Sequence, residues 1–390
     1  MIPLFKVFMS EDVAEPVTKV LKSGMITQAG QVESFEKDLK DFLKNPHLLT
    51  LNSATAGLTL AVRLLDLQPD DVVLTPALTC FASTAAIMAV HGNLRWIDAD
   101  PLTANVDLED IKRKLSPHTK AIVVVHWAGN PVDLNALRDI QDYCQCKFGH
   151  RPTVIEDCAH AFGAQYDGKP IGAESERGNI CVFSTQAIKH LTTGDGGIIT
   201  LPNQELYDRC KLLRWYGIDR TKRSGGDFRL EPDIEEWGYK FHMNDISATI
   251  GIHNLPHIKS LQEKTFLNFK TLEEKTKRSK YIFFISETEN SRSAHWLCSI
   301  LILDGRKEEF MLRAKEAGIT VSQVHNRNDG HSCVEKFREP LPQLDQLEKE
   351  LVCIPVGWWL TLKEVDHIAR FINNFGASDS KRQQCSCAMS

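Results

Sequence analysis

Residues 120–164 read KAIVVVHWAGNPVDLNALRDIQDYCQCKFGHRPTVIEDCAHAFGA. The apolar run at 120–129 predicts a buried strand, and 133–146 has helical spacing behind an aspartate that can cap the helix. Residues 153–164 begin as a second strand. A strand, a helix and a strand in that order predict two parallel strands of one sheet with helices packed on it.

The same alternation continues in both directions along the chain. Apolar strand-like runs occur at 70–80, 94–100, 179–185 and 196–202, and 108–116 has helical spacing. The sequence therefore predicts an α/β fold with a mostly parallel, mixed sheet covered by helices on both faces.

The pattern changes after about residue 250, which predicts a smaller C-terminal α+β domain. Its expected elements are a long helix at 261–282, short strands at 295–303 and 318–325, and a helix at 362–375. We therefore expect three parts: a large domain at 1–250, a small domain at 251–376 and a disordered tail at 377–390.

Composition excludes some classes of partner. The 390 residues are 42% hydrophobic and 25% charged, with a net charge of −5 and no long basic run. This predicts a soluble cytoplasmic protein and argues against nucleic acid or a membrane as the main partner. The eleven cysteines are scattered, which favours reduced, buried thiols and no metal site. The last four residues, CAMS, match a prenylation pattern, but so short a match is better explained by chance.

Two short stretches could hold the ends of a cofactor. An apolar run stops at Asn52-Ser53 and a helix begins at Ala54-Thr55, where free amides favour a phosphate. A plain helix cap is the alternative. Glu156 and Asp157 end a buried strand, where a carboxylate can pair with a protonated ring nitrogen. A cap or an internal ion pair is equally compatible with them.

A third stretch, FSTQAIKHLTTGDGG at 183–197, supplies a lysine. Ser184 can donate to a phosphate, and Lys189 can form a Schiff base if its pKa is depressed. A solvated loop lysine is the ordinary alternative. Together, a phosphate cradle, an acid for a ring nitrogen and a reactive lysine are what pyridoxal phosphate (PLP) needs.

The order of these motifs resembles the sugar aminotransferases of the DegT/DnrJ/EryC1/StrS family, which have the fold type I aminotransferase architecture. The similar stretches span nearly the whole chain: SGMITQAGQVESFEKDLKDF, NSATAGL, TPALTCFAS, IDADPLTANVD, EDCAHAFGA, FSTQAIKHLTTGDGG, LLRWYGIDR and GYKFHMNDISATIGIHNL. The resemblance implies a homodimer with PLP, or its amino form PMP, at active sites on the subunit interface.

The resemblance assigns roles to individual residues. Lys189 matches the lysine that holds PLP and moves the substrate proton, and Asp157 matches the acid that keeps the ring nitrogen protonated. Ser184 and the turn at Ala54-Thr55 match phosphate contacts. Lys240 stands where many relatives use Asn to reach the phosphate bound by the neighbouring subunit, and the TGDGG loop also matches a partner-facing position.

Several positions depart from the family pattern. His160 stands where many members carry Gln near the PLP hydroxyl, and Cys80 stands where many carry an aromatic ring stacked on the cofactor. Ala54 replaces a frequent Gly, and Phe81 is expected to point away from Cys80 if the backbone is extended here. A lysine at position 189 favours amino transfer over the related sugar dehydratases, which have His there.

The candidate substrate contacts are polar or aromatic residues that match the family's sugar-nucleotide site. Arginines suit a diphosphate, although a surface ion pair is equally compatible with each. Of the tryptophans we expect at least one to be core packing. The candidates are Thr27, Gln28, Arg214, Arg220, the stretch His325–Asp329 with Arg327, and Trp215, Trp358 and Trp359.

The resemblance implies transfer of an amino group from L-glutamate to a nucleotide-linked keto-deoxy sugar. We expect an NDP-4-keto-6-deoxyhexose that becomes a 4-amino-4,6-dideoxyhexose. The alternatives are an NDP-3-keto sugar, a PLP- or PMP-dependent sugar dehydratase, and a non-catalytic ligand-binding protein on the same fold.

Overall fold

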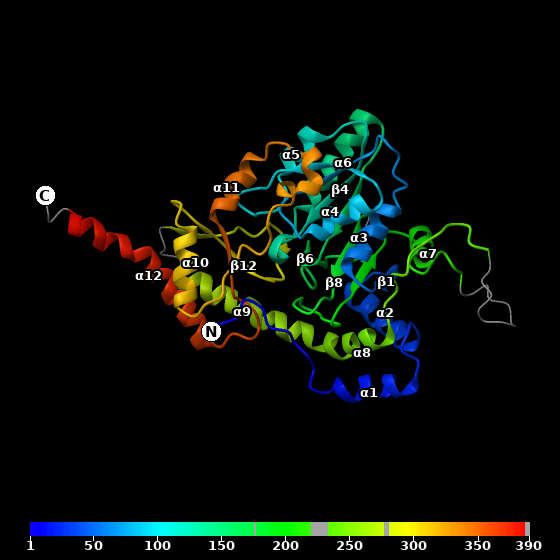
Figure 1. Cartoon of the computed structure of the whole chain (residues 1–390), viewed down its shortest axis with the longest axis horizontal. Coiled ribbons are helices and arrows are strands. Elements are labelled where there is room, and N and C mark those ends of the chain that lie inside the picture. Colours follow the sequence, from blue (N-terminus) through cyan, green and yellow to red (C-terminus); the bar gives the residue numbers. More distant parts are fainter. Residues whose placement is uncertain (175–176, 220–232, 277–280, 387–390) are drawn as a thin grey trace.

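The computed structural model describes residues 1–174, 177–219, 233–276 and 281–386, with side chains along the last helix as far as residue 375. A seven-stranded sheet lies at the centre of the larger part (Figure 1). Its strands, in spatial order, are β1 (Leu48–Leu51), β9 (Gly197–Thr200), β8 (Ile180–Ser184), β5 (Thr153–Asp157), β4 (Thr119–Val125), β2 (Val72–Pro76) and β3 (Asn93–Ile97).

Six of these strands share one direction. Strand β9 pairs antiparallel with both of its neighbours, and the remaining pairs are parallel. The prediction of a mostly parallel, mixed sheet is confirmed. Because parallel strands end at the same edge, Asp157 at the end of β5 and Ser184 at the end of β8 are brought to one side of the sheet.

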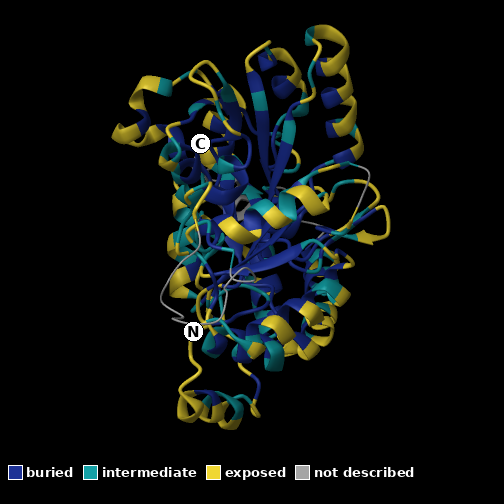
Figure 2. Ribbon diagram, turned by 90° about the vertical axis from the view of Figure 1, so that its right-hand side faces the viewer, coloured by how far each residue is buried: buried dark blue, intermediate teal, exposed yellow. Residues whose placement is uncertain are grey.

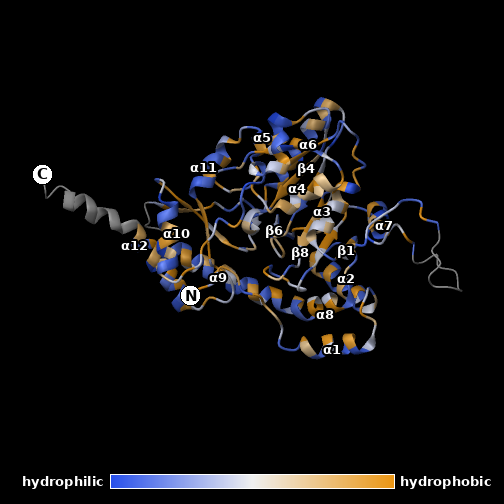
Figure 3. Ribbon diagram, viewed as in Figure 1, coloured by the Kyte–Doolittle hydropathy of each residue, from blue (hydrophilic) through white to orange (hydrophobic). Residues whose placement is uncertain are grey.

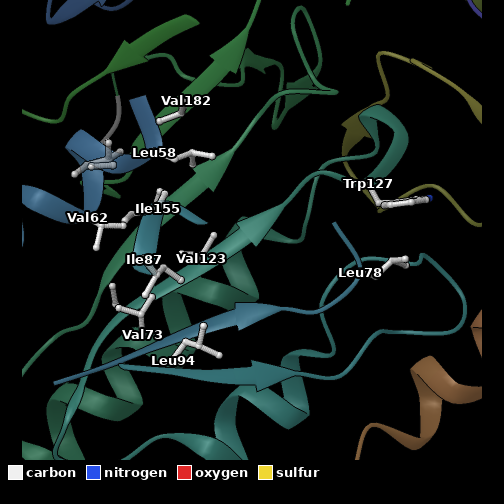
Figure 4. Close-up of a cluster of buried hydrophobic side chains, with 14 of the residues drawn as sticks. Leu58, Val62, Val73, Leu78, Ile87, Leu94, Val123, Trp127, Ile155 and Val182 are labelled. Carbon is white, nitrogen blue, oxygen red and sulfur yellow. The ribbon is translucent and has the colours of Figure 1, made fainter. Parts of the chain in front are cut away.

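Helices cover both faces of the sheet, which explains why strands such as β4 are apolar along their whole length. Val123 faces one buried cluster, which Figure 4 shows with Ile155 and Val182, while Ile122 and Val124 face the other. The first cluster includes α3 (Ala54–Arg63), α4 (Phe81–Ala89) and α7 (Gln204–Leu213); the second includes α2 (Gly30–Leu43), α5 (Leu108–Lys114), α6 (Leu134–Phe148) and α8 (Asp245–Asn254).

The smaller part has its own antiparallel sheet and its own apolar cluster. The sheet order is β10 (Ile282–Phe284), β12 (Cys298–Ile302) and β13 (Leu351–Ile354). Helices α9 (Ile258–Thr276), α10 (Lys307–Glu316) and α12 (Leu362–Ser386) contribute to that cluster, whereas α11 (Pro342–Glu350) packs on the first cluster of the larger part. The division that we predicted near residue 250 stays a prediction.

Two of our expectations about the smaller part differ from the structure. The segment 318–325 is no strand: it makes single bridges from Ile319 to Ile2 and from Ser322 to Cys353, and Val324 has a φ of 70°. The tail that we expected to be disordered from residue 377 is helical as far as Ser386 and extends away from the body (Figure 1). Residues 387–390, which hold the CAMS motif, lie outside the described residues.

The remaining elements lie outside these layers. A small sheet joins β11 (Ser291–Arg292), β6 (Gln165–Tyr166) and β7 (Lys169–Pro170), and α1 (Ala14–Ser23) packs beside α8. Figures 2 and 3 show buried, hydrophobic strands at the centre, with helices whose outer faces are exposed and hydrophilic. Within the described part of the chain, none of the helices has the length and apolarity needed to cross a membrane.

Candidate active site

Lys189 lies in the loop that joins β8 to β9. The loop is closed where Thr185 N–H donates to Gly196 O at 3.0 Å and Thr193 N–H donates to Thr185 O at 2.9 Å. The Lys189 side chain is partly accessible, yet the surrounding protein displaces enough water to lower the pKa of its amine to about 8. A depressed pKa makes the neutral, nucleophilic amine available near neutral pH.

Asp157 is buried at the end of β5 and belongs to the same site. Its carboxylate accepts a hydrogen bond from Ser83 Oγ at 2.7 Å and from the Ala159 backbone N–H at 3.0 Å. Burial raises the pKa of Asp157, while these bonds and the charge of Lys189 act to lower it. Both hydrogen bonds come from uncharged donors, so a cationic ring nitrogen placed here would offset the burial of the carboxylate.

Three aromatic rings stack beside Lys189. Its Nζ lies 3.6 Å from the centroid of the Trp296 ring. His160 stacks on Trp296 with centroids 3.9 Å apart, and His325 lies parallel to His160 at 5.7 Å. Desolvation and the charge of Lys189 lower the pKa of His160 well below its usual range and that of His325 to about 4, so both imidazoles are neutral at pH 7.

The start of α3 forms a turn next to Ser184. Ser53 caps the helix by accepting from Ala56 N–H at 3.1 Å, which leaves Ala54 and Thr55 at the first helical positions. Gly197 pairs with both Leu51 and Ser184, and a Cβ on it would lie 2.6 Å from Ala54 N. Glycine is therefore needed for the backbone of β9 to pass this close to the turn.

The chemistry of this donor set fits PLP. The described residues offer no hydrogen-bond partner for the buried His160 Nδ1, so the ring can still bind the cofactor hydroxyl. Lys189 supplies an amine, Asp157 supplies an acid, and the α3 turn with Ser184 supplies groups for a phosphate. These four residues and the turn are among the cofactor-binding positions that we predicted, and the structure brings them to one edge of the sheet.

Cys80 and Phe81 point to different neighbours. Cys80 is exposed at the N-cap of α4, and its thiol is one of the groups whose charge acts on the pKa of Lys189. The Phe81 ring meets His331 edge-on at 5.2 Å. Helix α4 begins at Phe81, so the extended backbone on which our expectation for Phe81 depended is not present there.

Glu156 faces away from the site and into a buried hydrogen-bond network. His126 Nδ1 accepts from Val132 N–H at 3.0 Å, so Nε2 carries the proton and donates to Glu156 at 2.9 Å. Asn179 donates to the other carboxylate oxygen at 2.6 Å. Cys158 lies nearby, but with both His126 nitrogens engaged the cluster is a structural network.

Two predicted substrate arginines are engaged in ion pairs. Arg214 is buried, and its Nη1 donates to Glu36 at 2.5 Å and to Thr50 O at 2.9 Å. Arg327 pairs with Asp329, Asp345 and Glu348. The alternative of a salt bridge therefore describes both side chains, and for Arg214 the pair is in the interior, not on the surface.

Three of the predicted substrate residues share one cavity, and the others lie elsewhere. Gln28, Arg214 and Trp215 line this cavity of about 240 Å³, and the Trp215 ring stacks on His242 with centroids 3.6 Å apart. Thr27 is exposed and accepts a backbone hydrogen bond from Asp245. Lys240 is exposed beside Asn52, which donates to its carbonyl at 3.2 Å. Arg220 lies outside the described residues.

Trp358 and Trp359 pack on the N-terminal segment. The Trp358 ring meets Phe8 edge-on at 5.5 Å, and Trp359 Nε1 donates to Pro3 O at 3.3 Å. These contacts explain both rings as packing, as we expected for at least one of the tryptophans.

Sequence reasoning missed Ser83 and Trp296. Ser83 lies within TPALTCFAS, one helical turn after Cys80, so a hydroxyl facing the strand ends was a usable signal. Trp296 comes from the segment before β12, more than a hundred residues after Lys189, and nothing in the local sequence indicates that it returns to this edge.

The chain resembles known aminotransferases in sequence and in structure. It matches sugar aminotransferase CalS13 from Micromonospora echinospora with a TM-score of 0.90 and 41% identity, covering 96% of this chain and 100% of that one. It matches AtS13 from Actinomadura melliaura with a TM-score of 0.91 and 41% identity, covering 96% and 98%. A UDP-4-amino-4-deoxy-L-arabinose–oxoglutarate aminotransferase from Shewanella sediminis is 32% identical over 67% of this chain.

The alignment with the Shewanella enzyme covers 66% of that enzyme's own length, just under two thirds. The model of the DegT/DnrJ/EryC1/StrS aminotransferase family matches residues 8–373, nearly the whole chain. Aminotransferases of that family depend on PLP, which agrees with the donor set described above. The chain therefore belongs to the DegT/DnrJ/EryC1/StrS aminotransferase family.

Proposed function

We propose that this protein is a PLP-dependent aminotransferase that moves an amino group from L-glutamate to a nucleotide-linked keto-deoxy sugar. The observation that carries the proposal is the amine of Lys189, with a pKa near 8, together with the buried carboxylate of Asp157 at one edge of the sheet. CalS13 is named a sugar aminotransferase and the Shewanella relative an oxoglutarate aminotransferase, which supports this substrate class.

The chemistry that PLP supplies when bound is storage of the amino group and an electron sink for the bond broken at the substrate carbon. Lys189 would be the point of covalent attachment. Once released, its amine would take the proton from the donor carbon and return it to the acceptor carbon. A pKa of about 8 suits both the uptake and the release of this proton, because neither the neutral nor the protonated amine is strongly disfavoured near neutral pH.

The other residues would hold and orient the ring. Asp157, fixed by Ser83 and Ala159, would keep the proton on the ring nitrogen. His160 would bind the ring hydroxyl through Nδ1, and its neutral charge leaves it free to donate or accept. Ser184 and the first amides of α3 would bind the phosphate.

Our proposed acceptor is an NDP-4-keto-6-deoxyhexose, which would become a 4-amino-4,6-dideoxyhexose; an NDP-3-keto sugar is the alternative. His325 is our leading candidate for a sugar contact, because it lies next to His160 and its buried Nε2 has no hydrogen-bond partner among the described residues. Thr27 and Gln28 remain candidates for the nucleotide. We do not extend that role to Arg214, whose guanidinium is bound to Glu36.

We propose that the active enzyme is a homodimer working in the cytoplasm. Lys240 is exposed, and it matches a position at which many relatives use Asn to reach the phosphate bound by the neighbouring subunit. In a dimer a lysine at this position would add a positive charge near the phosphate of the neighbouring subunit. Size measurement by light scattering at working concentration tests this: a stable monomer with full activity contradicts it.

The experiment that tests the function uses L-glutamate labelled with ¹⁵N and a panel of NDP-4-keto and NDP-3-keto sugars, with mass spectrometry of both products. Transfer of ¹⁵N to one sugar, with release of 2-oxoglutarate, establishes the reaction and names the acceptor. Loss of water from the sugar without ¹⁵N transfer indicates a dehydratase. No change in any sugar, in protein that holds PLP, would overturn the proposal and leave a ligand-binding role.

A further inference from the structure

Trp296 is attached to the loop that carries Lys189 by two reciprocal hydrogen bonds. Its Nε1–H donates to the carbonyl of Ile188 at 2.9 Å, and His190 Nε2–H donates to the carbonyl of Ala294 at 2.9 Å. The two bonds are made by the residues directly before and after Lys189, and on the other segment by Trp296 itself and by Ala294. The indole therefore has a fixed position relative to the lysine backbone.

The amine of Lys189 lies over the ring of this indole. Lys189 Nζ lies 3.6 Å from the ring centroid, well inside the roughly 6 Å at which a cation and a ring attract each other. Phe5 stacks on the same ring at 4.9 Å with an interplanar angle of 29°, and His160 stacks at 3.9 Å with 16°. These contacts keep water away from the ring, and tryptophan is the aromatic residue that binds a cation best.

We propose that Trp296 is a positioning residue that binds the ammonium form of the Lys189 side chain during the part of each turnover in which the amine carries a proton and is not bonded to the cofactor. The proposal rests on the proposed function, because only a lysine that is released and recaptured in each turnover needs a second binding place. The ring would hold the free amine close to the reacting atoms and in a defined orientation.

Other charges also act on Lys189, and they limit how much the ring can contribute. Asp157 at the end of β5 and Cys80 at the start of α4 favour the ammonium form, while desolvation by the surrounding protein opposes it. His160, His190 and His325 lie close enough for the lysine charge to act on them. Trp296, like Asp157 and Cys80, would favour the ammonium form of Lys189, although its ring carries no net charge.

The test measures the pKa of Lys189 in cofactor-free protein by competitive acetylation. Acetic anhydride reacts with neutral amines only, and peptide mass spectrometry gives the rate at Lys189 as a function of pH. The variants are Trp296→Phe, which keeps a ring face, and Trp296→Leu, which keeps an apolar side chain without one. Phe5→Leu is the matched control, since it removes the stacked neighbour and leaves the indole bonded to Ile188.

We expect Trp296→Leu to lower the pKa of Lys189 by about one unit, a tenfold rise in neutral amine below the midpoint, which corresponds to about 1.4 kcal/mol. Trp296→Phe should lie between Leu and wild type, and Phe5→Leu should match wild type. An unchanged or raised pKa in the Leu variant overturns the proposal. If that variant does not fold, Trp296→Met removes the ring while its unbranched, flexible side chain can adapt to the remaining space, with the same expected fall.

This readout is separate from catalysis. If the protein transfers no amino group but Trp296→Leu still lowers the pKa of Lys189, the proposed function fails and the contact with the ring stands. If amino transfer is confirmed and the pKa does not fall, the role of Trp296 fails alone.

Discussion

Replacing Arg214 by methionine separates a structural role from a substrate role. Its Nη1 donates to Glu36 Oε1 at 2.5 Å and to Thr50 O at 2.9 Å, and both ion-pair partners are buried. Glu36 Oε1 also accepts from Thr50 N–H at 2.9 Å and from Thr50 Oγ1 at 3.0 Å. Without Arg214 the carboxylate keeps two uncharged donors and has no counter-ion among the residues that the structure describes.

Breaking one side of a buried ion pair costs about 3–5 kcal/mol, because the remaining charge stays desolvated. We therefore expect Arg214→Met to lower the free energy of unfolding by about that amount. The assay is urea unfolding followed by tryptophan fluorescence at fixed protein concentration. The double variant Arg214→Met/Glu36→Gln should recover most of the loss, because the glutamine oxygen still accepts from Thr50 and no buried charge remains.

The kinetic part of the same experiment tests the substrate role. The double variant, once its stability is recovered, should bind the nucleotide sugar with a KM within about threefold of wild type, less than 1 kcal/mol. The opposite result would be an Arg214→Met variant of unchanged stability whose KM for the sugar nucleotide rises more than tenfold. That result would contradict the structural role and assign Arg214 to binding of the diphosphate.

Two further substitutions test the cofactor site. Asp157→Asn keeps the shape of the side chain but removes its charge, and turnover should fall on the order of 10²- to 10⁴-fold. A turnover rate near that of wild type would mean that another residue pairs with the PLP ring nitrogen. Gly197→Ala would place a methyl group 2.6 Å from Ala54 N, displace the α3 turn and weaken PLP binding about tenfold or more. Gly30→Ala, where a Cβ meets nothing within 4 Å, is its control in a fluorescence titration, and equal affinities for the two variants would contradict the assigned phosphate turn.

The cofactor end of the site could be predicted from the sequence because its residues are local to strand ends. Asp157 follows an apolar run, Ser184 ends another, and Ser53 precedes a helix, so the edge of a parallel sheet brings them together. The reactivity of Lys189 was predictable only from the combination of the lysine with the phosphate turn and the acid, because its low pKa comes from burial by residues distant in the chain.

The parts that could not be predicted depend on contacts between distant segments. Glu36 and Arg214 are 178 residues apart, so the sequence left the arginine open between a surface ion pair and a diphosphate contact. Trp296 returns to Lys189 from the segment before β12 through a hydrogen bond to a backbone carbonyl, which leaves no mark in the residue pattern. The polar stretch after 377 has the composition of a tail, and α12 nevertheless continues through it to Ser386.

Borohydride reduction of the PLP-loaded protein, followed by peptide mapping, shows directly whether Lys189 is the residue that binds the cofactor covalently. Reduction makes the bond between lysine and cofactor permanent, so mass spectrometry can locate it. We expect a single pyridoxyl group on Lys189 that is lost when L-glutamate is added before the reductant, and none in Lys189→Ala. A pyridoxyl group on another lysine, or on Lys189 with no response to any amino donor, would contradict the role of Lys189 in amino transfer.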